Sequence, residues 1–165
     1  MVKDEQKGSD LHVTNLMVEE VTGEDQIESM IKKARKNRAW AKTLCNERSS
    51  RSHSIFMLKI EGVNSKTGET CCGTLNLVDL AGSERVKDSG SEGMRLTEAQ
   101  AINKSLSNLG NVIMALAQKN SHVPYRNSKL THLLQNCLGG NSKTLMFVNI
   151  SPKEEHINET LNSLR

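Results

Sequence analysis

The chain has 165 residues, of which 36% are hydrophobic and 25% are charged. This length allows one domain with a hydrophobic core, and the composition excludes both a disordered chain and a membrane-embedded one. Lysine and arginine outnumber the acidic residues by 22 to 19, so the formal net charge of +3 tolerates acidic partners without proving one. Aromatic residues make up only 2% of the chain, which argues against the base-stacking surfaces of nucleic-acid-binding proteins.

The sequence also bears on the targeting of the protein and on its redox environment. The first ten residues are polar and no apolar run approaches the ~20 residues of a membrane span, so we expect neither a signal peptide nor a membrane partner. The four cysteines lack the spacing of zinc ligands. Cys71 and Cys72 are adjacent and make poor disulfide partners, which favours a reducing, intracellular environment.

Hydrophobic periodicity predicts the elements of the first half of the chain. Residues 11–21 alternate well enough for a strand, and residues 23–38 follow the pattern of an amphipathic helix, with Glu28 and Lys32 paired at i, i+4. Two further strands are expected at 54–63 and 73–80. The turn NSKTGE lies between them and predicts an antiparallel pair.

The second half is predicted to be mainly helical. A long helix is expected at 97–118 and a second at 127–140, where two glycines stop it. The apolar run 144–151 is typical of a strand buried on both faces, and a third helix begins at 154. Strands flanked by helices indicate an α/β layered domain. The expected inward faces of the two long helices are Ile102, Leu106, Leu109, Ile113 and Leu116, and then Leu130, Leu133, Leu134, Cys137 and Leu138.

Asp79 and Gly82 form a D-x-x-G motif that begins at the end of the strand expected at 73–80. In phosphate-binding α/β folds, an acid at the carboxyl end of a strand can hold Mg²⁺, directly or through water. A glycine beside it lets a backbone N–H approach a terminal phosphate. The motif is short, and an aspartate that caps a turn explains it equally well.

A second polar stretch, NERSSRSH at 46–53, precedes the strand expected at 54–63. Its hydroxyl groups suit Mg²⁺ and phosphate oxygens, and its arginine suits a carboxylate. Taken alone, the stretch is more typical of a solvated serine-rich turn than of a binding loop.

Together, NERSSRSH and DLAGSER in this order resemble the two nucleotide switches of the kinesin motor domain. The resemblance continues through INKSLSNLGNVIMAL, HVPYRNSKLTHLLQNCLGGNSKTLMFVNISP and INETLNSLR, and covers the chain from Leu11 onward. The stretches LHVTNL, NERSSRSH and SKTLMFVNISP look closest to the minus-end-directed, C-terminal-motor kinesins.

The resemblance implies a three-layer α/β fold of the P-loop NTPase type, present over residues 1–165 as its C-terminal half. The sequence contains no G-x-x-x-x-G-K-[ST], the P-loop that kinesin motors carry upstream of the first switch. We therefore expect a partial motor domain that does not hydrolyse ATP alone. Its expected parts are a first switch at 46–53, a second switch at 79–84, a relay helix at about 97–118 and a second microtubule-contact helix at about 127–138.

The resemblance also implies a site for ATP and Mg²⁺ in the complete motor domain. Ser49 and Ser50 match the first-switch serines that face the γ-phosphate and Mg²⁺, and Asn46 matches a residue of the same nucleotide-facing loop. Asp79 would hold Mg²⁺ through water, and Gly82 would sense the γ-phosphate with its N–H.

Two charged residues complete the implied catalytic set. Arg51 and Glu84 match the salt bridge that joins the two switches and, with Ser49, helps order the attacking water. The glycine turn between Asp79 and Glu84 could then reorient when the phosphate leaves.

A set of basic residues is the candidate surface for microtubules. The resemblance places the relay helix against the filament, and tubulin is acidic, so lysine and arginine side chains would steer toward it. A solvated polar face is the alternative that spacing alone favours. The candidates are Lys104, Arg126, Lys129 and His132, with Lys87, Arg95 and Lys119 as weaker ones.

A basic run in the first predicted helix could also suggest nucleic acid, but we interpret it as the solvent side of an amphipathic helix. His12, His53, His122 and His156 are interpreted as structural or exposed. The run consists of Lys32, Lys33, Arg35, Lys36, Arg38 and Lys42.

Three functions follow from these patterns. The first is a segment of a microtubule motor in the cytoplasm and the microtubule cytoskeleton, including the spindle, which dimerises through a stalk outside this chain. The second is a microtubule-binding module without ATPase activity. The third is a small GTPase-like switch, which needs an N-K-x-D motif; Asn103-Lys104 is followed by Ser-Leu and does not supply one.

Overall fold

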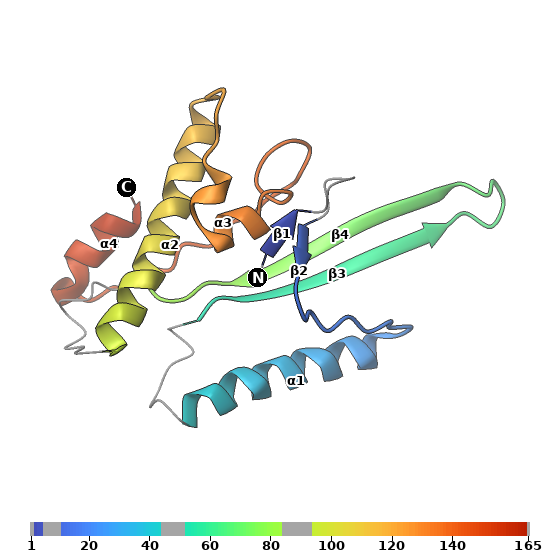
Figure 1. Ribbon diagram of the computed structural model, residues 1–165, viewed down its shortest axis with the longest axis horizontal. Helices are drawn as coiled ribbons and strands as arrows, with labels where there is room; N and C mark the ends of the chain where they lie inside the picture. The colour runs from blue at the N-terminus through green and yellow to red at the C-terminus, as the bar shows by residue number, and fades with distance from the viewer. Residues whose placement is uncertain (1, 5–10, 44–51, 84–93, 165) are drawn as a thin grey trace. The chain divides into compact units, whose positions relative to one another are not determined.

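The computed structural model describes residues 2–4, 11–43, 52–83 and 94–164 (Figure 1). It divides into two units, one formed by residues 18–82 and the other by residues 1–17 together with 83–165. Among the described residues, every helix is too short or too polar to cross a bilayer.

The unit of residues 18–82 is built around a long antiparallel ribbon. Strand β3 (Ser54–Val63) pairs with β4 (Thr70–Asp79), as the sequence predicts. The turn closes because the Asn64 N–H donates to the Glu69 carbonyl at 2.8 Å and the Gly68 N–H donates to the Asn64 carbonyl at 2.8 Å. Gly68 has a φ of 72°, a left-handed conformation that glycine adopts without steric cost.

Helix α1 (Glu24–Thr43) lies in the same unit and extends five residues beyond the predicted end. At its N-terminus the Gln26 Oε1 accepts from the Thr22 N–H at 2.8 Å, which holds the chain that enters the helix, and the first turn is acidic, which suits the helix dipole. The predicted Glu28–Lys32 pair is confirmed at 2.9 Å.

The second unit has its core between two helices. Helix α2 (Met94–Ala117) confirms the predicted long helix, and it packs against α3 (Lys129–Leu133). A 3-10 turn, η3 (Tyr125–Asn127), leads into α3 and also contacts α2. The buried apolar side chains of this core are Leu109, Val112, Ala115, Leu130 and Leu134.

The inward face of α2 differs in part from the predicted one. Leu109 is buried as expected, but Ile113 is 38% exposed and Val112 is fully buried. Val112 and Ile113 are consecutive, so they lie ~100° apart around the helix, and only one of them can face α3. The core stripe follows residues three apart (109, 112, 115).

Helix α3 is shorter than the predicted span of 127–140. The Ser128 side chain caps its start by accepting from the Thr131 N–H at 3.0 Å. Beyond Leu133 the helix tightens, because Gln135 and Cys137 donate to carbonyls only three residues back. The two predicted stop glycines take left-handed φ values, 109° at Gly139 and 59° at Gly140. A side chain at Gly139 would also meet Leu116 at 3.0 Å.

Two strand predictions need correction. The strand expected at 11–21 is only β2 (Leu11–Val13), which pairs antiparallel with β1 (Val2–Asp4). It ends because the chain turns: the Leu16 N–H donates to the Val13 carbonyl at 3.2 Å, and Asn15 has a φ of 61°.

The strand expected at 144–151 is wrong for this structure. Leu145 is 77% exposed and Phe147 is 79% exposed, and no strand among the described residues pairs with this segment. A strand needs a neighbour for its backbone hydrogen bonds, so the apolar pattern alone does not form one. The chain then enters a 3-10 turn, η4 (Glu154–His156), and helix α4 (Ile157–Leu164), where a helix was expected.

Thr131 supplies a test of the α2–α3 unit. Its side chain is fully buried, and its hydroxyl donates to the Tyr125 carbonyl at 2.6 Å. Thr131→Val keeps the shape but removes the donor, so we expect the free energy of unfolding to fall by about 1–3 kcal/mol. Thr97→Val, at an exposed position of α2, is the control and should change it by less than about 0.5 kcal/mol. Equal effects in urea titrations followed by circular dichroism would contradict the role of this bond.

Candidate functional site

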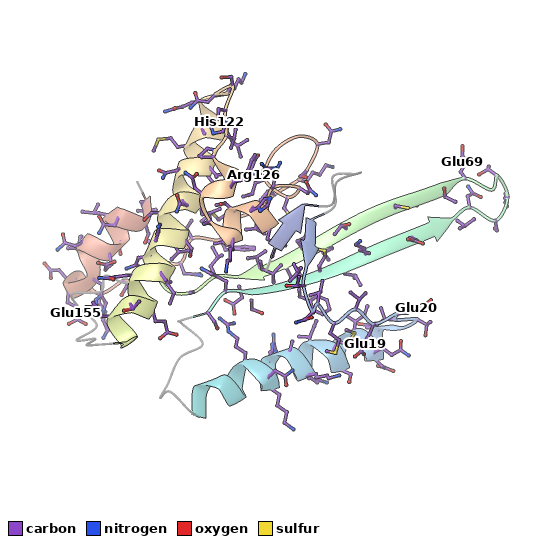
Figure 2. The ribbon with its side chains drawn as sticks, in the orientation of Figure 1. Glu19, Glu20, Glu69, His122, Arg126 and Glu155 are labelled. Atoms are coloured by element: carbon purple, nitrogen blue, oxygen red, sulfur yellow. The ribbon has the colours of Figure 1, made fainter. Side chains whose placement is uncertain are left out.

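The D-x-x-G motif lies at the end of the ribbon opposite its turn. β4 ends at Asp79, and the register places Ser54, the first residue of β3, directly opposite it. Figure 2 shows Glu69 at the far, turn end of the ribbon. The ribbon therefore brings the end of the stretch NERSSRSH and the start of the D-x-x-G motif to the same place.

Arg38 of α1 joins these two stretches. Its Nη1 forms an ion pair with Asp79 Oδ2, its Nη2 donates to the Ser52 carbonyl at 2.6 Å, and its Nε donates to the Ser52 hydroxyl at 3.3 Å. The Arg38 side chain is only 18% exposed, while that of Asp79 is 72% exposed. A planar guanidinium can make all of these contacts at once, which a lysine ammonium cannot reproduce.

The interpretation of Arg38 as part of a solvated helix face is therefore wrong. A signal for its position was present in the sequence, because Arg38 is spaced from Ile27, Ile31 and Ala34 by 11, 7 and 4 residues. These spacings place all four side chains on one side of the helix. The spacing predicts which side of the helix carries Arg38. It does not predict the partner of Arg38, Asp79, which is 41 residues away.

His53 forms the second link between the stretches. Its Nδ1 accepts a hydrogen bond from the Ala81 N–H at 3.1 Å, and Ala81 is buried. Burial, and then the positive charge of Arg38, lower the pKa of His53 from its ordinary value of 6.5. The neutral ring with its proton on Nε2 is the form that can accept this bond. Sequence reasoning assigned His53 no partner, and the structure supplies a backbone one.

The remaining predicted site residues are only partly described. Gly82 is half-buried and follows Ala81 directly, so the His53 bond fixes the backbone beside it. The part of the chain that the structure describes contains no cluster of three or more metal-ligating side chains. Six predicted residues lie outside the described residues: Asn46, Ser49, Ser50, Arg51, Glu84 and the weaker filament-contact candidate Lys87.

The basic candidates lie on elements of the other unit. Lys104 is exposed on α2, Arg126 is exposed on η3, and Lys129 is exposed at the start of α3. Figure 2 shows Arg126 beside α3. His132 was expected to face outward, but it is half-buried in α3, the helix that packs against α2.

Comparison with known proteins assigns the family. The model of the kinesin motor domain matches residues 1–165, and the chain belongs to this family. Kinesin-related protein 2 of Dictyostelium discoideum is 62% identical over 153 residues, which are 93% of this chain and 19% of that protein. Carboxy-terminal kinesin 2 of Xenopus laevis is 57% identical over 155 residues, which are 94% of this chain and 24% of that protein. The predicted resemblance to C-terminal-motor kinesins is confirmed.

Solved structures confirm a partial kinesin fold. The motor domain of Kar3 from Saccharomyces cerevisiae is 55% identical with a TM-score of 0.81, and the match covers 99% of this chain and 50% of that one. The C-terminal motor and motor homology domain of Kar3Vik1 is 53% identical with a TM-score of 0.84, and the match covers 42% of that chain. This chain therefore spans about half of the solved motor domains and about a fifth of the curated relatives.

The Arg38 contacts generate one prediction. Arg38→Ala should free Asp79 and Ser52, so the Ala81 amide should exchange its hydrogen several-fold faster in deuterium exchange measurements, and Arg38→Lys should be intermediate. The pKa of His53 should also rise in Arg38→Ala, because the neighbouring positive charge is gone. Lys33→Ala, on the exposed side of the same helix, is the control. Exchange at Ala81 that is unchanged in Arg38→Ala would contradict the linking role.

The His53 bond predicts a pH dependence. Because its pKa is lower in the folded state than the 6.5 of the free side chain, the unfolded state binds more protons as pH falls below 6.5. The stabilisation by neutral His53 is thus complete above pH 6.5 and is lost as the pH falls through the folded pKa. NMR titration should show the His53 ring and the Ala81 amide shifting together below pH 6.5.

His53→Asn serves as the matched variant for this titration. Its side-chain oxygen can accept the same bond but does not titrate, so the Ala81 amide should lose its pH dependence while the fold remains. An Ala81 titration that persists in this variant would mean that another group causes it.

Proposed function

We propose that this chain is the switch-bearing and filament-contacting part of a kinesin motor, and that the complete motor uses ATP to move along microtubules. The observation that carries the proposal is the register of the ribbon, which pairs Ser54, directly after the first switch stretch, with Asp79, the last residue of β4 and the first of the D-x-x-G motif. Membership of the kinesin motor domain family over residues 1–165 supports it.

The described residues are compatible with Mg²⁺ held through water. Mg²⁺ binds in proteins through one or two carboxylates, several waters and substrate phosphates. The Asp79 side chain is 72% exposed, so its carboxylate remains open to a metal-bound water even while Arg38 binds Oδ2. When bound, Mg²⁺ neutralises charge on the phosphate oxygens during phosphoryl transfer. We propose Asp79 and Ser50 for the metal.

Arg38 and His53 position this site rather than react in it. The guanidinium restrains the Asp79 carboxylate and the backbone at Ser52, which leads out of the first switch. His53 holds the Ala81 N–H, so the next residue, Gly82, starts from a fixed backbone position. In our proposal the Gly82 N–H approaches the γ-phosphate, Asn46, Ser49 and Ser50 bind the nucleotide, and Arg51 with Glu84 orders the attacking water.

Filament contact is proposed for the other unit. α2, η3 and α3 pack together, so they hold Lys104, Arg126 and Lys129 on one structural body, with the half-buried His132 as a fourth contact. Positive side chains there would attract the acidic surface of tubulin. The cytoskeleton, including the spindle, is the proposed location, and a dimer through a stalk is the proposed assembly. Nucleic acid and membranes are not proposed as partners.

A second candidate function is a microtubule-binding module without ATPase activity. The absence of a G-x-x-x-x-G-K-[ST] sequence from these 165 residues favours it for the chain alone. Without the N–H cradle for the β-phosphate, positioning of the nucleotide would fail. We expect purified 1–165 to release no phosphate from ATP above background, with or without microtubules.

Charge removal tests the filament contact. Arg126→Ala with Lys129→Ala should weaken cosedimentation of the chain with microtubules about fivefold to tenfold at low salt and reduce its salt dependence, because screened attraction is lost. Lys59→Ala with Lys66→Ala removes the same charge from exposed positions of the ribbon and should leave binding within about twofold. Binding that falls equally in both pairs would reflect net charge and overturn the assignment to η3 and α3.

A further inference from the structure

Tyr125 of η3 is held by hydrogen bonds at its side chain, its carbonyl and its N–H. The hydroxyl donates to the Leu138 carbonyl at 2.6 Å, and the Tyr125 carbonyl accepts from the Thr131 hydroxyl at 2.6 Å. The Tyr125 N–H donates to the Val123 carbonyl at 2.9 Å. The tyrosine therefore ties the 3-10 turn to α3 and to the chain that follows α3.

The Tyr125 hydroxyl can reach its acceptor because position 139 is a glycine. Gly139 has a φ of 109°, and a Cβ at that position would lie 3.2 Å from the hydroxyl oxygen and 3.0 Å from Leu116 Cδ2. Tyr125 is itself half-buried. A phenol packed this closely has little room to move, so its hydroxyl stays on the Leu138 carbonyl.

The same hydrogen-bond network fixes the residue directly before each of two proposed filament contacts. Tyr125 directly precedes Arg126. Ser128 directly precedes Lys129, and its hydroxyl accepts from the Thr131 N–H at 3.0 Å and lies 2.8 Å from the Thr131 hydroxyl. Thr131 is fully buried in the unit where α3 packs against α2 (Figure 1). The backbone beside both cations is therefore anchored to the core.

This anchoring bears on how the cations bind. Arg126 and Lys129 are exposed and have long side chains, so binding to an acidic surface must order them. The ordering costs less when the backbone beneath them is already fixed, and such preorganisation raises affinity. We propose that Tyr125 is a positioning residue for filament binding: its hydroxyl bond holds η3 and the start of α3, so that Arg126 and Lys129 meet an acidic surface at a fixed spacing. This inference rests on the proposed filament contact.

Tyr125→Phe tests the hydroxyl, since it keeps the ring and changes no charge. We expect cosedimentation of the chain with microtubules at low salt to weaken about threefold to tenfold, because one hydrogen bond that fixes the contact is lost. The salt dependence of binding should also fall, because fewer ionic contacts form. Ser142→Ala is the matched control: it removes a 2.7 Å hydroxyl bond to the Asn136 carbonyl that does not involve η3, and it should bind within about twofold of the unaltered chain.

A double-mutant cycle separates positioning from a loss of stability. In a chain that carries Arg126→Ala and Lys129→Ala, Tyr125 has no cations to position. Adding Tyr125→Phe to that chain should therefore change microtubule binding by less than about twofold. A purely structural role predicts the same fold-change in both backgrounds, and that result would overturn the inference.

Two substitutions at Thr131 give a second readout. Thr131→Val removes the hydroxyl that binds the Tyr125 carbonyl and should weaken microtubule binding as Tyr125→Phe does. Thr131→Ser keeps the hydroxyl but loses a buried methyl group, so it should lower stability in urea titrations and still bind microtubules within about twofold of the unaltered chain. Far-UV circular dichroism verifies that each variant is folded. Equal binding by the two Thr131 variants would overturn the inference.

The outcomes distinguish this inference from the proposed function. Binding that is unchanged in Tyr125→Phe but falls in Arg126→Ala with Lys129→Ala would overturn the positioning role alone. Binding that is unchanged in Arg126→Ala with Lys129→Ala would overturn the filament contact and the positioning role together.

Discussion

The register of the β3–β4 ribbon is the constraint on which the candidate site depends. Because Ser54 pairs with Asp79, two stretches far apart in the sequence emerge at the same end of one ribbon. A slip of one residue would move every side chain of a strand to the other face, and it would also separate these ends. The turn bonds at Asn64 and Gly68 hold the register from the other end.

Two side chains use this register to connect the stretches, and neither is in the D-x-x-G motif. Arg38 reaches both Ser52 and Asp79, and His53 holds Ala81 through a backbone hydrogen bond. These contacts restrain Asp79 and the backbone at Ser52 and Ala81, directly before Gly82, which as a glycine would otherwise be free to adopt many conformations. They also couple to each other, since the charge of Arg38 helps keep His53 neutral. In the proposed nucleotide switch, these restraints would define the conformation that a bound phosphate changes.

The ribbon shows how two strands of a kinesin motor domain pair in a chain that spans about half of the solved motor domains. Both of its strands are apolar enough to be central strands, but the described residues supply neither neighbours for the edges nor cover for the face of Leu75 and Leu77. Residues 144–151 have the same property in the other unit. Local pairing forms the ribbon because its two strands are joined by a short turn, whereas an isolated strand has no local partner.

The amino-acid sequence by itself determined the hairpin, the helices α1 and α2, the D-x-x-G motif and the family resemblance, because each depends on local spacing or on residue order. It also predicted a strand at 144–151 and a longer α3, and both were wrong in this structure. A strand is completed only by a neighbour, and the length of α3 was set by turn bonds beyond Leu133. Only the tertiary structure decided that Arg38 binds Asp79 and that His53 accepts from Ala81, since contacts between distant residues require the chain to be folded before they exist.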